Sequence, residues 1–145
     1  MIIIKAHIDH LEDIIPLFDG YRVFYKQHSD TEGARQFLIE RFKDKDSIIF
    51  IAYSKDKAVG FTQLYPLHSS VSMQPMYLLN DLFVDANYRG QGVGEALIEK
   101  AKLLCVSENN KGLAIQTALD NPAQYLYERL GFERDTDLQF FWTTQ

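Results

Sequence analysis

A glycine-rich loop at residues 89–94, with the sequence RGQGVG, is the segment of this chain best suited to chemistry. It follows an apolar, strand-like run at Leu78–Val84 and leads into the helical pattern of Glu95–Lys100. A loop that opens a helix leaves several N–H groups unpaired at the positive end of the helix dipole, which attracts anions. Glycines let the backbone approach an anion closely, and Arg89 adds a guanidinium that can reach it. The loop therefore predicts a ligand that carries a phosphate or pyrophosphate.

Two common nucleotide-binding loops do not match this spacing. The dinucleotide fingerprint G-x-G-x-x-G fits Gly90 and Gly92, but its third glycine falls on Glu95. That fingerprint also normally follows the first strand of its unit, whereas this loop lies past the middle of the chain. The Walker loop needs a lysine after its last glycine, and none follows Gly94. These mismatches argue against a nucleotide-binding α/β protein.

A second motif lies downstream, at Thr117–Phe132, with the sequence TALDNPAQYLYERLGF. The pattern Arg89-x-x-Gly92-x-Gly94 resembles the [RQ]-x-x-G-x-[GA] signature of the GNAT superfamily of acetyl-CoA-dependent N-acetyltransferases. The downstream segment resembles that family's strand–Asn–helix block, which ends in L-Y-x-x-x-G-F. Both motifs occur in the family's order and spacing. The stretches Gly60–Pro66 and Leu79–Val84 further resemble the branch of histone and polyamine acetyltransferases.

The resemblance implies acetyl-CoA as co-substrate and assigns residues to it. The N–H of Leu82 would face the thioester carbonyl, the backbone of Val84 would bind the pantetheine amides, and the loop would wrap the pyrophosphate. From the residues alone, Leu82–Val84 can be ordinary strand core, Arg89 a surface charge and Asn121 a helix cap. The expected acetyl-CoA contacts are Leu82, Phe83, Val84, Arg89, Gly90, Gln91, Gly92, Val93, Gly94, Glu95, Asn121, Ala123 and Tyr127.

Acetylation of an amine requires the amine to lose a proton and the leaving thiolate to gain one. A tyrosine has a pKa near 10 and stays protonated at neutral pH, so it can donate to a thiolate. In GNAT enzymes the tyrosine of L-Y-x-x-x-G-F has this role, and Tyr127 occupies its position. The helical spacing of Ala123, Leu126 and Leu130 equally allows Tyr127 to be a core residue.

The general base is less well defined. Polyamine acetyltransferases of the superfamily carry an acidic pair before the F-V of this strand, and here the pair reads Asn80-Asp81. Histone-type members place a catalytic glutamate at the position of Leu78, which cannot accept a proton. We predict that Asp81 acts through water or orients the amine. The alternative is a structural Asp81 that binds loop N–H groups.

The acceptor site is expected where the first two helices connect. Tyr21, Tyr25, Asp30 and Glu32 lie there, and carboxylates and aromatic faces can hold a cation, although each can also be solvated surface. A small cationic amine such as a polyamine is the expected acceptor. An amino acid or a protein lysine or N-terminus is the alternative, as is an acyl-CoA-binding module without activity. The predicted acceptor contacts are Tyr25, Glu32, Asn80 and Asp81.

Periodicity along the chain predicts the elements that position these residues. Their order is β-α-α-β-β-β-α-β-α-β-β, an α/β (α+β, three-layer) domain over residues 1–145 with about seven mostly antiparallel strands and four helices. The order is that of the GNAT fold, in which the fourth and fifth strands splay apart around pantetheine. The expected strands are 2–6, 47–53, 58–67, 75–84, 113–119, 132–134 and 138–143, and the helices begin near Asp9, Asp30, Gly94 and Asn121.

Composition excludes several other classes. The 145 residues are 46% hydrophobic, enough for one core, and the net charge of −5 argues against a nucleic-acid partner. We expect no metal, since no His/Cys cluster has ligand spacing, and no membrane span or signal peptide. The single cysteine, Cys105, suits the cytoplasm. A homodimer through the aromatic strand at 138–143 is expected, although core packing would explain those aromatics equally well.

Overall fold

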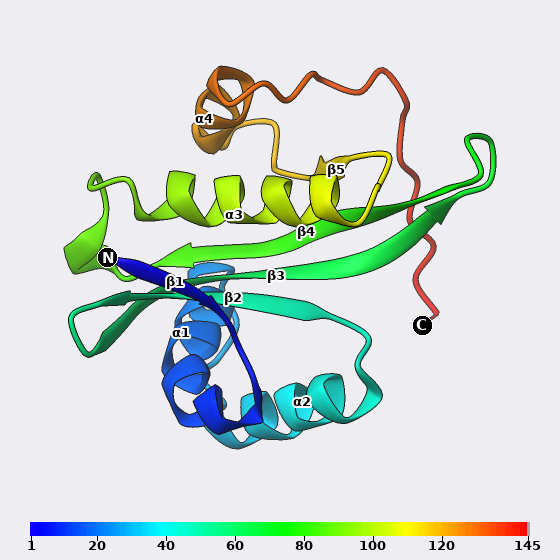
Figure 1. The fold of residues 1–145 in the computed structure, drawn as a ribbon. Coiled ribbons are helices and arrows are strands. Elements are labelled where there is room, and N and C mark those ends of the chain that lie inside the picture. Colours follow the sequence, from blue (N-terminus) through cyan, green and yellow to red (C-terminus); the bar gives the residue numbers. More distant parts are fainter. Residues whose placement is uncertain (145) are drawn as a thin grey trace.

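Five strands form one mixed sheet in the order β1-β2-β3-β4-β5, which is also their order along the chain (Figure 1). The computed structural model describes residues 1–144. Strands β1 to β4 pair antiparallel, whereas β5 lies parallel to β4 after a helical crossover. The mixed α/β class predicted from the sequence is confirmed. The strands are β1 (Ile2–Lys5), β2 (Ile48–Ser54), β3 (Lys57–Ser69), β4 (Gln74–Val84) and β5 (Leu113–Ile115).

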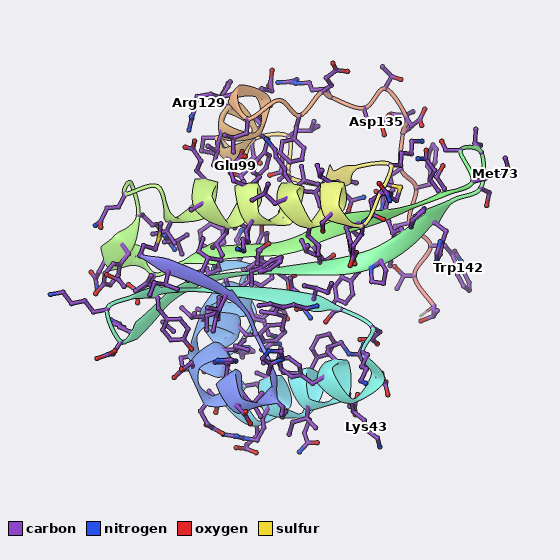
Figure 2. The ribbon with its side chains drawn as sticks, viewed as in Figure 1. Lys43, Met73, Glu99, Arg129, Asp135 and Trp142 are labelled. Carbon is purple, nitrogen blue, oxygen red and sulfur yellow. The ribbon has the colours of Figure 1, made fainter. Side chains whose placement is uncertain are left out.

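Four α-helices cover the two faces of the sheet, and side chains fill the layers between them (Figure 2). α1 (Leu11–Phe24) and α2 (Thr31–Asp44) pack on one face, and α3 (Val93–Ser107) packs on the other, with α4 (Ala123–Arg129) beyond it (Figure 1). Short 3-10 turns at Ile8–His10 and Ala86–Tyr88 precede α1 and the glycine loop. Asp30 begins α2 as expected, because its side chain accepts from the N–H of Gly33 at 2.9 Å.

Alternate side chains of the central strands divide the core into two halves. Phe61 of β3 faces α1 and α2, where Ile14 and Leu38 are fully buried. Leu64 of β3 faces α3, beside the buried Leu97. This period of two is that of a strand covered on both faces. As a result, side chains on the Phe61 side of β3 and β4 look towards α1 and α2.

Two irregularities open the sheet next to β5. Gln63 pairs with Asp81 while Leu64 pairs with Leu79, so Asn80 is an extra residue that forms a β-bulge. β5 has only 3 residues, and it pairs with β4 only from Tyr77 to Leu79. Within residues 1–144, therefore, Asn80–Val84 of β4 has no strand neighbour on this side, and we call this segment the open edge of β4.

The prediction of two further strands at 132–134 and 138–143 is wrong, because the described residues form five strands and not seven. Alternating apolar residues become a strand only when a neighbour offers its N–H and C=O groups, and β5 ends at Ile115 and not at 119 as expected. A side-chain hydrogen bond from Gln116, which directly follows β5, to Gln139 connects the C-terminal segment with this part of the chain. The C-terminal segment is exposed, with Leu138 at 82%, Phe140 at 87%, Phe141 at 85% and Trp142 at 82%, and Figure 2 shows Trp142 away from the helices.

Candidate active site

The open edge of β4 presents the peptide groups of Leu82 and Val84. The N–H of Asp85 donates to the carbonyl of Val59 on β3 at 2.8 Å. The N–H and C=O groups of the odd-numbered residues in this stretch of β4 therefore face β3. Peptide groups alternate along a strand, and those of Leu82 and Val84 therefore point away from β3. A ligand that carries amides can bind such an edge as an added strand would.

The glycine loop follows this edge directly, at the N-terminus of α3. Gly90 and Gly92 have φ angles of 74° and 84°, a left-handed conformation that glycine adopts without strain. A Cβ on either would meet no atom within 4 Å, so the loop surface is open. The first bond of α3 runs from the N–H of Ala96 to the carbonyl of Gly92. The N–H groups of residues 93–95 precede this bond and have no partner within the helix, so they can bind an anion.

Arg89 is held across the open edge. Its Nε donates to the carbonyl of Val84 at 2.9 Å, and its guanidinium lies 5.5 Å from the ring centre of Phe83 and 5.8 Å from that of Phe24. This bond uses one of the two lone pairs of the Val84 carbonyl, which leaves one for a ligand amide. Arg89 thereby connects the glycine loop with the end of α1.

α4 is attached to the start of α3. Arg129 of α4 pairs with Glu95 in the first turn of α3 at 3.1 Å, and its charge offsets a carboxylate that would repel an anion there. At the other end of α4, Asn121 Oδ1 accepts from the N–H of Ala123 at 2.9 Å. The N-cap of α4 is Pro122, so the expectation that Asn121 caps this helix is wrong by one residue. The NH₂ group of Asn121 is the part that can donate to a ligand.

Tyr127 of α4 is half-buried, and its ring lies edge-on to Phe132 with the centres 6.1 Å apart. Burial raises the pKa of Tyr127, and the nearby Tyr25 adds to this effect. A phenol with a raised pKa keeps its proton at neutral pH and can donate it. Packing in the core and donating a proton are therefore compatible roles for Tyr127.

Asp81 is a buried carboxylate on the face of β4 towards α1 and is only 3% exposed. Burial raises the pKa of Asp81 to about 6, against the opposing effect of the nearby polar groups of Asn80 and Tyr21. Asn80 Nδ2 donates to Asp81 Oδ1 at 2.6 Å, and the Tyr21 hydroxyl donates to the backbone carbonyl of Asn80 at 3.1 Å. A carboxyl with this pKa changes charge close to neutral pH and suits general-base chemistry.

Three tyrosines share the surroundings of this carboxylate. The rings of Tyr21 and Tyr25 lie 4.9 Å apart. Burial raises the pKa of Tyr21 most, and Asp81, Tyr25 and Tyr127 raise it further. Such influence falls with distance, so these groups from α1, β4 and α4 lie near one another. The fold thus brings together four residues selected from the sequence, namely Asp81, Tyr21, Tyr25 and Tyr127.

Glu32 is engaged elsewhere, and two residues of β3 were missed. Glu32 pairs with Arg35 at 3.5 Å, so its role at the acceptor stays a prediction. Gln63 is the cross-strand partner of Asp81, and Tyr65 lies two residues further on the same face. A sequence signal for them existed, because a polar residue that alternates with Phe61 in an apolar strand faces inward and needs a partner.

Known proteins identify the family. Residues 45–134 match the acetyltransferase (GNAT) domain. The chain is 47% identical over 124 residues to the uncharacterized N-acetyltransferase YhfO of Bacillus subtilis (strain 168), covering 85% of this chain and 83% of that protein. The crystal structure of a probable acetyltransferase has a TM-score of 0.93 at 35% identity and covers 100% of this chain and 98% of its own. The chain therefore belongs to the GNAT acetyltransferase family and has the GNAT fold.

A further structure with this fold contains CoA. The aminoglycoside N-acetyltransferase AAC(6′)-Iy in complex with CoA has a TM-score of 0.85 at 22% identity, covering 99% of this chain and 95% of its own. At that identity the likeness concerns the fold alone. Among residues 1–144, no helix is both long and apolar enough to cross a membrane, and no group of three or more His, Cys, Asp or Glu could hold a metal ion.

Proposed function

We propose that this protein transfers the acetyl group of acetyl-CoA directly to a primary amine of a small cationic acceptor. The observation that carries the proposal is a buried carboxylate, Asp81, within the open edge of β4, and a half-buried phenol, Tyr127, which packs with Leu82 and Val84 against the same core cluster. The first can take a proton from the amine, and the second can give one to the leaving thiolate.

The residues along the open edge fit acetyl-CoA, which supplies the acetyl thioester. The loop at 89–94 and the start of α3 suit the pyrophosphate, as the open surface over Gly90 and Gly92 leaves room for it. The outward peptide groups of Leu82 and Val84 suit the pantetheine amides, and the Asn121 amide offers a further donor. Phe83, whose side chain faces α1, contributes through packing.

The proton transfers balance with two side chains. An alkylammonium has a pKa of about 10.4 and must lose a proton before its nitrogen can attack a carbonyl. Asp81 accepts that proton, directly or through water. The N–H of Leu82 donates to the carbonyl oxygen while this oxygen gains negative charge. Tyr127 donates its hydroxyl proton to the sulfur as the carbon–sulfur bond breaks. The nitrogen loses its second proton after the attack, and this proton returns to Tyr127 through water.

A cationic acceptor is favoured by the groups on the α1 side of the site. The Asp81 carboxylate, the Asn80 oxygens and the faces of Tyr21 and Tyr25 attract a cation, and the net charge of −5 assists its approach. The resemblance to the histone and polyamine branch favours a polyamine. An aminoglycoside, as in the name of AAC(6′)-Iy, an amino acid, and a protein lysine or N-terminus are the competing acceptors.

We further propose that the protein acts in the cytoplasm as a homodimer. Its cysteine, Cys105, is buried and free, which suits a reducing compartment. The exposed apolar side chains at 138–142 form a contiguous segment of the kind that monomeric proteins rarely expose. A second copy of the chain is the partner that this segment is proposed to meet.

The function is tested by the release of CoA thiol from acetyl-CoA over a panel of amines. The panel holds spermidine, an aminoglycoside, free lysine, and peptides with a lysine or a free N-terminus. Turnover highest with spermidine is the expected result. Binding of acetyl-CoA without turnover on any amine would instead identify an acyl-CoA-binding module, and Asn80 in place of the first acidic residue of the pair would explain it.

A further inference from the structure

Unpartnered polar atoms occur on Gln63, the cross-strand partner of Asp81, and on two residues at and just after the end of α2. Among residues 1–144, four buried side-chain atoms have no hydrogen-bond partner, and three of them are Gln63 Oε1, Arg41 Nε and Asp46 Oδ1. Buried polar atoms are nearly always paired, because an unpaired one loses its bonds to water without replacement. Internal water bridges groups of this kind, and a site for it needs two to four polar partners.

These atoms belong to one group of residues, the Gln63 cluster: Arg41, Asp46, Ser47, Gln63 and Tyr65. Gln63 is fully buried, and its Nε2 donates to Ser47 Oγ at 3.0 Å. Arg41 pairs with Asp46, the neighbour of Ser47 in the chain, at 3.2 Å. Burial raises the pKa of Tyr65 to about 12, with Asp81 and Asp46 adding to the effect and Arg41 opposing it. Tyr65 therefore lies within electrostatic range of both Asp81 and the Arg41–Asp46 pair.

The cluster connects Asp81 with the exterior. Directly paired residues on adjacent strands have Cβ atoms about 4.5–5.5 Å apart, so Gln63 lies beside the Asp81 carboxylate. At the other end, the side chains of Arg41 and Asp46 are 21% and 40% exposed. The titratable, charged or hydrogen-bonding groups around Asp81 come from several elements: Tyr21 of α1, Tyr25 just after it, Gln63 and Tyr65 of β3, Asn80 of β4 and Tyr127 of α4. Arg41 and Asp46, at and just after the end of α2, lie near Tyr65.

We propose that the Gln63 cluster holds ordered water and forms the route by which Asp81 returns its proton to solvent. This inference rests on the proposed function. The amine gives a proton to Asp81, Asp81 passes a proton to water bound at Gln63 Oε1, and this water passes one outward past the Arg41–Asp46 pair. Only protons move, and no bond to carbon is involved. Gln63 is thus a positioning residue that touches neither substrate.

The test compares Gln63→Leu and Tyr65→Phe with a matched control, Tyr77→Phe. Tyr77 lies on the opposite face of β4, is 7% exposed, and donates to Glu108 at 2.6 Å, so its variant also loses a hydroxyl from a largely buried tyrosine. NMR titration of the Asp81 carboxyl carbon in the ligand-free protein is the first readout. Loss of the water should raise the pKa of Asp81 in Gln63→Leu by at least one unit, a tenfold change in proton affinity. Tyr65→Phe should shift it in the same direction, and Tyr77→Phe should leave it unchanged.

The second readout is acetylation of the best amine. Gln63→Leu should lower kcat about tenfold and move its pH profile upward, without changing KM for acetyl-CoA, and Gln63→Asn should restore part of the rate. Equal Asp81 titration in all variants would overturn the proposal while wild-type turnover still supports the proposed function. If the pKa of Asp81 shifts in Gln63→Leu but the wild type acetylates no amine, the water site is supported. Its use in catalysis is then rejected together with the proposed function. If Gln63→Leu does not fold, Tyr65→Phe and Ser47→Ala carry the same comparison.

Discussion

Burial acts in the same direction on Asp81 and Tyr127, with different chemical consequences. Both groups are neutral when protonated, so removal from water raises both pKa values. For the phenol this secures a proton that it already holds at neutral pH. For the carboxyl it moves the titration to about 6, where a proton can be both taken and released under physiological conditions. The same desolvation therefore suits both proposed roles, Tyr127 as the acid and Asp81 as the base.

Replacement of Tyr127 by phenylalanine tests the acid. Tyr127→Phe keeps the ring that packs near Phe132 and removes only the hydroxyl. We expect kcat to fall by about 10²–10⁴, the usual contribution of a positioned proton donor, with acetyl-CoA affinity unchanged in calorimetry. Tyr125→Phe, on the exposed side of the same helix, is the control and should retain full activity. A kcat within twofold of wild type would return Tyr127 to a purely structural role.

The pKa of Asp81 also predicts how stability depends on pH. Because the folded state raises this pKa from 3.8 to about 6, Asp81 stabilises the fold fully only below pH 3.8, and this contribution is lost as pH rises through 6. Above pH 6 the buried charge costs roughly 3 kcal/mol relative to the protonated form. The free energy of unfolding of Asp81→Asn, measured relative to wild type, should therefore be higher at pH 8 than at pH 4. The variant should also lose activity. Urea unfolding at both pH values measures this, and an equal difference at the two would contradict it.

Among the elements, the start of α3 depends most on backbone conformation. Gly92 precedes the first helical residue with φ at 84°, where a Cβ costs about 1–2 kcal/mol. Gly92→Ala should lower the free energy of unfolding by about that amount and weaken CoA binding about tenfold, because the N–H groups of the first turn are redirected. Gly112→Ala is the matched control, since its Cβ meets nothing within 4 Å and its φ is not left-handed. Equal CoA affinity in the two variants would remove the loop from the binding site.

Patterns within short stretches of sequence predicted most helices and strands. The wrong predictions concern features that depend on contacts between residues far apart in the chain. The loop before α3 and the Asp30 cap depend on neighbouring residues, so spacing alone located them. The bulge at Asn80 depends on the register between β3 and β4, which the sequence of β4 does not contain. The expected strand at 138–143 had the right alternation but no partner ladder. The pattern of β3 marks Gln63 as an inward-facing polar residue, but only the register between β3 and β4 places it beside Asp81.

At the scale of the whole molecule, the sheet has two ends of different character. At β1 the edge is a short strand of 4 residues, a common way to limit further pairing. At β5 the edge is 3 residues long and lies next to the opening at Asn80–Val84, while the exposed C-terminal segment begins just beyond α4. The Gln116–Gln139 bond ties this segment to the residue that follows β5, and its exposed apolar side chains are the surface that a second copy would bury.

The aromatic segment predicts the oligomeric state. Three fully buried aromatic side chains remove about 450–750 Å² from water, close to the roughly 800 Å² per partner of a stable interface. Combined replacement of Phe140, Phe141 and Trp142 by serine should therefore convert a dimer into a monomer in sedimentation velocity experiments. Leu103→Ser with Val106→Ser, which removes exposed apolar side chains from α3, should leave the dimer intact. A wild-type protein that sediments as a monomer at all concentrations would assign the segment to another partner.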